Sequence, residues 1–318
     1  IQLPEKVIEL IQKFQKNNFE IYIVGGTSRG LLTGYPIADW DFATSAEPDQ
    51  MQKMFPKNHF YNNEFGTVSI VMGKSEKDVF EVTTFRTEKE YDDFRRPEKV
   101  EWGESIEEDL SRRDFTINAI AIEIQIRNSK STDLAETEPR AGQIRKIIDP
   151  YNGQEDLENK IIRAVGEPNK RFQENALRLM RAVRIATQLG FIIENDTFKS
   201  IQKNAGLIEN IAWERIRDEF LKLIASSHPA DGILLLFNAG LLEHVMPELI
   251  KGKGVDQPKH HISTVWKHCI DSLRYCPSED PIVRLATLLH DIGKPVTMEG
   301  KGNERTFYNH EVVGARIA

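Results

Sequence analysis

The chain has 318 residues, of which 40% are hydrophobic and 29% charged, and its formal net charge is −7. These values indicate two or three packed domains, and nothing in the composition suggests disorder. The two cysteines, Cys269 and Cys276, are too few for a disulfide framework and are not at a zinc-binding spacing, so we expect a reducing, cytoplasmic compartment. Because an acidic chain argues against nucleic acid as a partner, the local distribution of charge matters more than the total.

The first 150 residues read as a domain of helices and strands. Residues 3–14 place apolar side chains at helical spacing, interrupted by charges, so they form neither a signal peptide nor a membrane span. The β-rich run 20–24 ends at Gly25-Gly26, after which residues 27–32 can form a short helix. Further strands are expected at residues 39–43, 67–72 and 79–85. The sequence therefore predicts an α+β fold with a small mixed sheet.

From about residue 156 the pattern becomes helical almost throughout. We expect an α+β head at residues 1–150, a helical neck at 151–225 and a helical body at 226–318. A basic stripe lies in the neck, where Glu167 and Glu174 accompany seven basic residues: Lys160, Arg163, Lys170, Arg171, Arg178, Arg181 and Arg184.

Two aspartates follow the glycine turn. Asp39 and Asp41 are two residues apart on a predicted strand, so both side chains leave the same face and can share divalent cations. Two carboxylates in this arrangement suit Mg²⁺. By itself the pattern has a purely structural alternative, since D-x-D is frequent in loops and at sheet edges.

The surrounding residues favour the metal-binding interpretation. A Gly-Gly turn between a strand and a helix lets backbone amides approach a phosphate. Gly25-Gly26, Arg29 and then Asp39 and Asp41 resemble the signature of the DNA polymerase β nucleotidyltransferase superfamily. Residues 111–119, 166–172 and 177–191 follow in order and are similar to consecutive motifs of class II (bacterial-type) tRNA nucleotidyltransferases, of the CCA-adding and poly(A) polymerase family.

The resemblance implies attack of a tRNA 3′-hydroxyl on the α-phosphate of CTP or ATP, with release of pyrophosphate and no obligatory protein partner. Two Mg²⁺ ions are expected on Asp39 and Asp41, with Glu81 as the third carboxylate, although Glu81 also suits an ordinary edge strand. Arg112 and Arg113 are expected to grip the triphosphate and Asp114 to orient them. The complete nucleotide-binding set is Gly25, Gly26, Arg29, Arg112, Arg113, Asp114, Asn118, Glu174, Asn175, Arg178 and Arg181.

In this family an acid and an arginine on one helix contact the Watson-Crick edge of the incoming base. The matching segment is residues 174–178, in which Arg178 supplies a donor. Asn175 stands where the family usually has aspartate, and its amide can also donate, so discrimination against UTP or GTP is expected to weaken. Gly30 replaces a second aspartate of the family pattern.

Residues 91–97, including Asp92, Arg95 and Arg96, resemble the flexible loop with which CCA-adding and A-adding enzymes reshape the pocket for ATP. CC-adding enzymes characteristically lack this loop. The segment therefore favours terminal A addition, with a charged surface loop of no catalytic role as the alternative.

Residues 289–294 resemble the HD motif of metal-dependent phosphohydrolases. The expected ligands of this second metal site are His268, His290, Asp291 and His310, against structural or incomplete ligands as the alternative. The run 309–315 is ordinarily the middle of an HD domain, so we expect a partial HD domain in a truncated chain.

Three alternatives to CCA addition stay open. An A-adding enzyme or a poly(A) polymerase carries nearly the same motifs. An HD phosphohydrolase with a relic transferase head is disfavoured because Asp39, Asp41, Arg113 and Arg178 are present. A catalytically weak tRNA-binding protein is suggested by Gly30 and Asn175.

Overall fold

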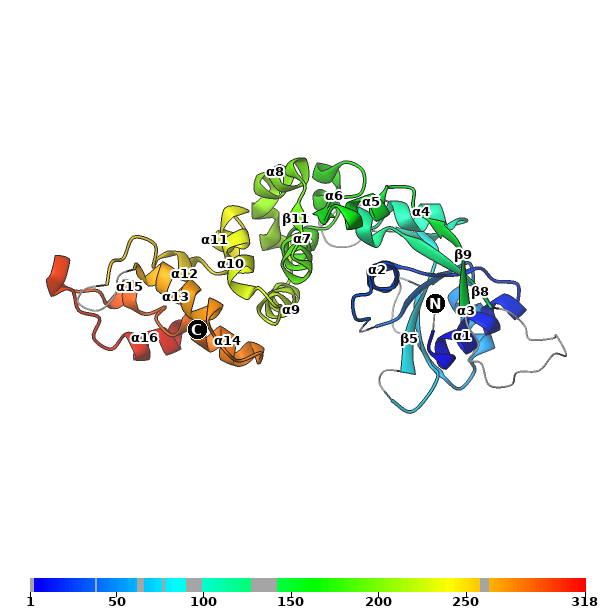
Figure 1. Ribbon diagram of the computed structural model, residues 1–318, viewed down its shortest axis with the longest axis horizontal. Coiled ribbons are helices and arrows are strands. Elements are labelled where there is room, and N and C mark those ends of the chain that lie inside the picture. The colour runs from blue at the N-terminus through cyan, green and yellow to red at the C-terminus, as the bar shows by residue number, and fades with distance from the viewer. Residues whose placement is uncertain are drawn as a thin grey trace. The chain divides into compact units, whose positions relative to one another are not determined.

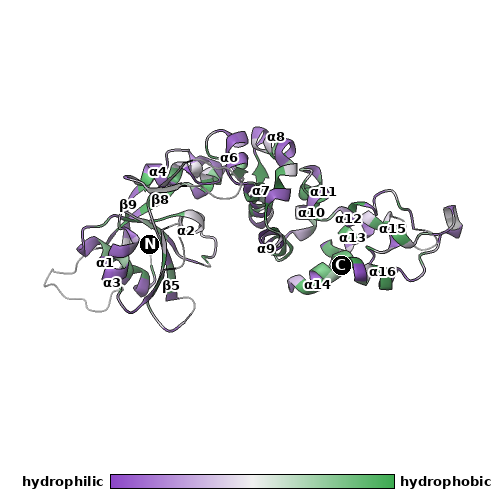
Figure 2. Ribbon diagram, turned by 180° about the vertical axis from the view of Figure 1, so that it is seen from behind, coloured by the Kyte–Doolittle hydropathy of each residue, from purple (hydrophilic) through white to green (hydrophobic). Residues whose placement is uncertain are grey.

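The structure, a computed structural model, describes residues 3–37, 39–61, 66–75, 78–89, 99–126, 142–257 and 263–318. The chain divides into two compact units between Glu167 and Pro168, except that Lys160–Ile162 belongs to the second unit (Figure 1). Hydrophilic and hydrophobic residues alternate along the helices of both units (Figure 2), as expected for helices that cover a core with one face. None of the helices in the described ranges is both long and apolar enough to cross a membrane.

The first unit contains a seven-stranded sheet of order β3-β4-β5-β2-β1-β8-β9. Its β2 and β5 are parallel and the other neighbours antiparallel, which confirms the predicted mixed sheet. The strands are β1 (Ile21–Ile23), β2 (Asp41–Thr44), β3 (His59–Tyr61), β4 (Thr67–Val71), β5 (Val79–Thr84), β8 (Ala121–Ile126) and β9 (Gly142–Ile148), with β6 (Arg86–Lys89) and β7 (Lys99–Trp102) as a separate pair. The helices are α1 (Glu5–Lys16), α2 (Gly25–Thr33), α3 (Pro48–Met54), α4 (Ile106–Ser111) and α5 (Gly153–Glu158), with the 3₁₀ turn η2 (Thr116–Asn118).

Helix α1 forms because its apolar residues recur at helical spacing and all reach the core. Val7, Ile8, Ile11 and Phe14 are buried against the sheet. The helix ends at Lys16, and Asn18 follows with a φ of 62°, a conformation that asparagine tolerates better than most residues. The turn sends the chain directly into β1.

The two faces of the sheet have different environments. On one face, Phe42 and Val82 join the apolar core that contains α1 and α3. On the other face, Ala43 packs in a second core with Ile106 and Leu110 of α4. Because side chains alternate along a strand, Asp41 projects on the face of Ala43, toward the α4 side.

The second unit is helical apart from the two-residue parallel pair of β10 (Ile161–Ile162) and β11 (Ile192–Ile193), so the predicted all-α body is confirmed. Helix α7 packs on α9 and α10, and α13 packs on α10 and α14. The helices are α6 (Pro168–Glu174), α7 (Leu177–Leu189), α8 (Asn195–Asn204), α9 (Trp213–Ile224), α10 (Pro229–Asn238), α11 (Leu242–Val245), α12 (Pro247–Ile250), α13 (Val265–Arg274), α14 (Pro281–Leu289), α15 (Lys294–Thr297) and α16 (His310–Ile317), with the 3₁₀ turns η3 (Ala205–Asn210) and η4 (Gly302–Glu304).

Candidate functional site

The glycine turn brings the backbone against a carboxylate and a guanidinium. Gly25 opens α2 with a φ of +66°, where a side chain would be strained. A Cβ added there would lie 3.2 Å from Asp41 Oδ2 and 3.3 Å from Arg113 Nη1. Gly26 follows in the first turn of α2. Asp41 and Arg113, far apart in the sequence, therefore meet at the same turn.

The three predicted metal ligands occupy different kinds of position. Asp41 is the first residue of β2 and lies in parallel register with Glu81 of β5, so the two side chains project from the same face on adjacent strands. Asp39 lies in a bend before β2, which corrects the prediction that both aspartates sit on one strand. Their carboxylate oxygens are the ligands that hard divalent cations such as Mg²⁺ prefer.

The arginine pair is anchored by Asp109, a residue outside the motifs of the sequence. Arg112 Nη2 lies 2.5 Å from Asp109 Oδ1, and Arg113 Nη2 lies 2.8 Å from Asp109 Oδ2. Asp109 belongs to α4 and is fully buried. Burial raises the pKa of its carboxyl, but the charges and hydrogen bonds of the two arginines outweigh this effect and hold the pKa below its ordinary value. The spacing of three and four residues on a helix was the available signal.

Asn118 links the arginine pair to α2. Its Oδ1 accepts a hydrogen bond from Arg29 Nη1, and its Nδ2 donates to Asp114 Oδ1 at 3.1 Å. Its carbonyl accepts from Arg113 Nη1 at 3.5 Å. Asp114 also accepts from the Phe115 amide at 2.9 Å. The predicted residues Arg29, Arg113, Asp114 and Asn118 are thus brought together in the first unit.

The second unit holds the predicted base-reading segment. Glu174 Oε2 lies 2.6 Å from Arg178 Nη1 and 2.9 Å from Arg171 Nη1. The Arg178 Nη1 atom also donates to the Arg171 carbonyl at 3.0 Å, and Arg178 is buried. Arg181 lies three residues further along α7, half-buried.

Asn175 is engaged with the backbone. Its Oδ1 accepts from the Leu177 amide at 3.1 Å, which satisfies one of the open N–H groups at the start of α7. The other polar group of this side chain, Nδ2, is a hydrogen-bond donor.

A second cluster of potential ligands lies around Asp291. Of the described residues, His268, His290 and Asp291 bring three candidate ligand atoms within 4.8 Å of one another, whereas the three head carboxylates do not form such a group. The Nε2 atoms of His268 and His290 lie 3.4 Å and 3.3 Å from Asp291 Oδ2. His310 Nε2 lies 3.5 Å from Asp291 Oδ1, so all four predicted residues meet. Imidazole nitrogens with one carboxylate suit transition metals such as Mn²⁺ or Zn²⁺.

A buried lysine holds the carboxylate of this cluster. Lys294 Nζ donates to Asp291 Oδ2 at 2.7 Å and to Gln257 Oε1 at 2.6 Å. Burial raises the pKa of Asp291. The hydrogen bonds and charges of His290 and Lys294 lower it by more, so the net pKa lies below the ordinary range. The hydrogen bond to Asp291 in turn raises the pKa of His290. The cluster therefore keeps an ionised carboxylate.

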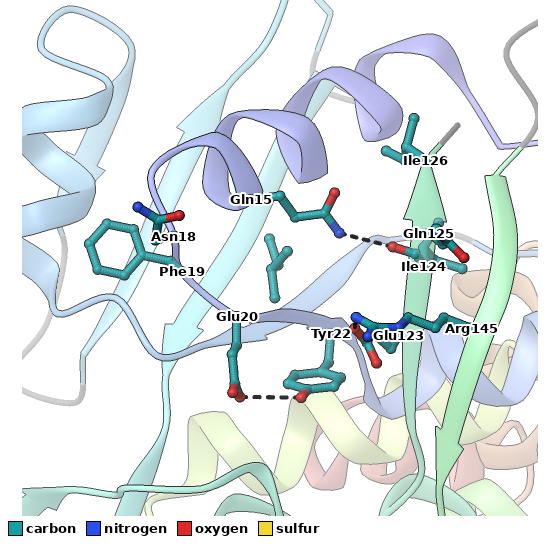
Figure 3. A pocket seen from close by; sticks show the side chains of 11 residues that line it. Gln15, Asn18, Phe19, Glu20, Tyr22, Glu123, Ile124, Gln125, Ile126 and Arg145 are labelled. Atoms are coloured by element: carbon teal, nitrogen blue, oxygen red, sulfur yellow. Dashed lines mark hydrogen bonds and ion pairs between the residues drawn. The ribbon is translucent and has the colours of Figure 1, made fainter. Parts of the chain in front are cut away.

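The loop residues Asp92, Arg95 and Arg96 lie outside the described residues. A cavity of about 400 Å³ in the first unit contains none of the predicted site residues (Figure 3). Its lining includes Tyr22 of β1 and Ile124 of β8, and Gln15 donates to the Ile124 carbonyl at 2.9 Å.

Comparison with known proteins identifies three regions. Residues 21–163 match the poly A polymerase head domain, residues 190–252 the probable RNA and SrmB-binding site of polymerase A, and residues 261–318 the HD domain. The CCA-adding enzyme of Ligilactobacillus salivarius is 44% identical over 229 residues, covering 72% of this chain and 51% of that protein. The chain spans about half the length of the curated relatives it matches.

Solved structures give the same result. The Bacillus stearothermophilus CCA-adding enzyme in complex with CTP is 39% identical, with a TM-score of 0.61 over 76% of this chain and 53% of that one. A tRNA nucleotidyltransferase complexed with a primer tRNA and an incoming ATP analog is 25% identical, with a TM-score of 0.60 over 87% of this chain and 74% of that one.

Proposed function

Because this chain belongs to the tRNA nucleotidyltransferase and poly(A) polymerase family, we propose that it adds C, C and then A from CTP and ATP to tRNA 3′ ends. The observation that carries the proposal is the meeting of Asp41, in register with Glu81, and Arg113 at the Gly25 turn. This arrangement combines a carboxylate pair for divalent cations with a cationic, amide-rich turn for a triphosphate.

Each head residue has a distinct role in this proposal. Asp39, Asp41 and Glu81 would hold two Mg²⁺ ions, which would lower the pKa of the attacking 3′-hydroxyl and neutralise the triphosphate. Arg112 and Arg113 bind phosphate oxygens, and Asp109 fixes their direction through the two ion pairs. The amides of Gly25 and Gly26 approach the phosphates, and Arg29 with Asn118 keeps the turn in place.

The start of α7 selects the base. Cytosine and adenine both present an exocyclic amino donor beside a ring-nitrogen acceptor, so one acceptor and one donor on the protein select them. Arg178 is the donor and is held by Glu174. Asn175 Oδ1 accepts from the Leu177 amide and keeps a second lone pair for the amino group of cytosine or adenine, whereas its Nδ2 can donate to a uracil or guanine carbonyl. We place the reaction in the cytoplasm, on the 3′ end of the tRNA acceptor arm.

The proposal is tested by incorporation of each labelled NTP, singly and in pairs with Mg²⁺, into tRNAs that end before CCA, after C and after CC. Two CTP additions followed by one ATP addition are the expected result. The double variant Asp39→Ala, Asp41→Ala should lose at least about a thousandfold in rate, as for loss of metal-centred catalysis. Asp196→Ala, which removes an exposed aspartate of α8, is the matched control and should retain the rate.

Each departure from this result has a defined meaning. ATP addition to the CC-ended tRNA alone makes the protein an A-adding enzyme, and long A tails on generic RNA make it a poly(A) polymerase. UTP incorporation that Asn175→Asp suppresses assigns the base selectivity to Asn175. Absence of any incorporation contradicts the proposal.

The ligand cluster around Asp291 supports a second candidate function, metal-dependent hydrolysis of phosphate esters or cyclic phosphates. In the Asp39→Ala, Asp41→Ala variant, which lacks the head site, we expect the protein to bind Mn²⁺ in equilibrium dialysis and to hydrolyse bis(p-nitrophenyl) phosphate, and the further change His290→Ala to reduce both by more than about tenfold. His244→Ala, which removes a surface histidine paired with Glu209, serves as control. Metal binding without hydrolysis would make the cluster structural.

A further inference from the structure

Thr27 is a buried residue of α2 that bonds to the backbone of both aspartates. Its side chain is 1% exposed. The hydroxyl Oγ1 donates to the Asp39 carbonyl at 2.8 Å and accepts from the Asp41 amide at 2.9 Å. One hydroxyl therefore bridges the two ends of the Asp39-Trp40-Asp41 segment.

The hydrogen bond from the Asp41 amide to the Thr27 hydroxyl replaces a backbone hydrogen bond between β1 and β2 that is lost where α2 begins. β1 and β2 are antiparallel, and the Val24 amide donates to the Asp41 carbonyl at 3.1 Å. In a continued ladder the Asp41 amide would donate back to the Val24 carbonyl. That carbonyl instead accepts from the Ser28 amide at 3.4 Å, because α2 begins there. The Thr27 hydroxyl takes the Asp41 amide in its place.

We propose that Thr27 is a positioning residue that sets Asp39 relative to Asp41 for metal binding, an inference that rests on the proposed nucleotidyl transfer. Asp41 is fixed by its strand, but Asp39 lies in a bend and its carbonyl is held by the Thr27 hydroxyl. The same hydroxyl joins the D-x-D segment to the helix that carries Gly25 and Gly26. Without the Thr27 hydroxyl, the position of the Asp39 side chain relative to Asp41 is no longer fixed.

The test compares Thr27→Val, which removes the hydroxyl and keeps the shape, with wild type and Thr27→Ser in the full chain. Mn²⁺ binding without RNA or nucleotide is followed by electron paramagnetic resonance, and the head site is defined as the binding lost in the Asp39→Ala, Asp41→Ala variant. Thr27→Val should weaken that binding about tenfold, the size expected from one lost hydrogen bond network. The Mg²⁺ concentration that half-saturates nucleotide incorporation should rise similarly, and Thr27→Ser should restore both.

Thr84→Val is the matched control. The Thr84 hydroxyl is equally buried in the same unit and donates to the Ala46 carbonyl at 2.8 Å, away from the aspartates. Equal weakening by Thr27→Val and Thr84→Val, with equal loss of thermal stability, would reduce the effect to general destabilisation and overturn the inference. Should Thr27→Val not fold, Thr27→Ser and Thr27→Ala, which differ by one hydroxyl, provide the same comparison.

The outcomes separate this inference from the proposed function. If wild type incorporates nucleotides and Thr27→Val equals it in Mn²⁺ binding and Mg²⁺ dependence, only the role of Thr27 is wrong. If wild type incorporates no nucleotide and the double aspartate variant binds Mn²⁺ as wild type does, the transferase proposal and the role of Thr27 both fall.

Discussion

Gly30 permits a close approach that a side chain at this position would prevent. A Cβ there would lie 2.8 Å from Ile37 Cγ1 and 3.2 Å from the Tyr35 carbonyl oxygen. The segment that leads from α2 to the aspartates thus packs directly on the helix backbone. The family resemblance predicts aspartate at this position, and the structure shows what its absence makes possible.

We predict that Gly30→Asp lowers the free energy of unfolding by about 1–3 kcal/mol, because the overlap outweighs the small gain in helix propensity. Urea denaturation measures the change. Ile37→Ala in the same background should recover part of the loss, whereas the contact with the backbone at Tyr35 remains. A Gly30→Asp protein as stable as wild type would mean that the segment moves without cost.

The elements that hold Gly25, Asp41 and Glu81 were predictable from local sequence, namely one turn and two strands, whereas the roles of these residues stay predictions. Thr27 was not predictable, since its importance depends on Asp39 and Asp41, which folding brings to its hydroxyl. Asp109 has a local signal, the spacing to Arg112 and Arg113, but its importance also depends on its burial in the fold. The bond from Asn175 to Leu177 spans two residues and is the kind of contact that a helix start predicts.

At the scale of elements, α4 depends on one buried charge. Asp109 is paired with Arg112 and Arg113, and its pKa is lowered from the ordinary value of 3.8. A lowered pKa in the folded state stabilises the protein above the unfolded pKa, and this contribution disappears as the pH falls through the folded value.

We therefore predict that Asp109→Asn costs about 3 kcal/mol of unfolding free energy at pH 7, since two half-buried guanidinium groups lose their ion pairs with Asp109. The difference from wild type should begin to shrink as the pH falls below the ordinary pKa, where the unfolded carboxyl takes up a proton, and disappear below the lowered pKa of the folded carboxyl. Urea unfolding from pH 7 down to about pH 2.5 measures the change. Glu107→Gln, on the exposed face of the same helix, should show no such pH-dependent difference, and a constant Asp109→Asn difference across this range would contradict the assignment.

Element types were predicted better than element neighbours. The patterns of α1, β1, β4 and β5 are confirmed because periodicity and burial agree. β8 alternates isoleucines in the same way but was not singled out, and its place beside β1 depends on a contact across about a hundred residues. β2 begins at Asp41 and not at Asp39 as predicted, because the Asp39 carbonyl bonds to Thr27 of α2 and not to a neighbouring strand.

At the scale of the whole molecule, the basic stripe of the neck is largely neutralised. Arg163 pairs with Asp156, and Arg184 pairs with Glu219. Arg171 and Arg178 share Glu174. Lys160 and Lys170 of the stripe are exposed. Of the seven basic residues of the stripe, four are already in ion pairs with carboxylates. These four can bind phosphates only if the ion pairs break.

This distribution predicts that the proposed binding of tRNA depends only weakly on salt concentration. Each phosphate neutralised contributes about −0.7 to −0.9 to the slope of log affinity against log salt, so two lysines give about −1.4 to −1.8, where extensive phosphate binders reach about −10. Filter binding or anisotropy from 50 to 300 mM KCl measures the slope. Lys160→Gln with Lys170→Gln should bring it toward zero, and Lys222→Gln, an exposed lysine of α9 outside the stripe, should leave it unchanged. A slope steeper than about −5 would require the paired arginines to exchange their carboxylates for phosphates, and Glu174→Gln or Glu219→Gln would then steepen it further by freeing those cations.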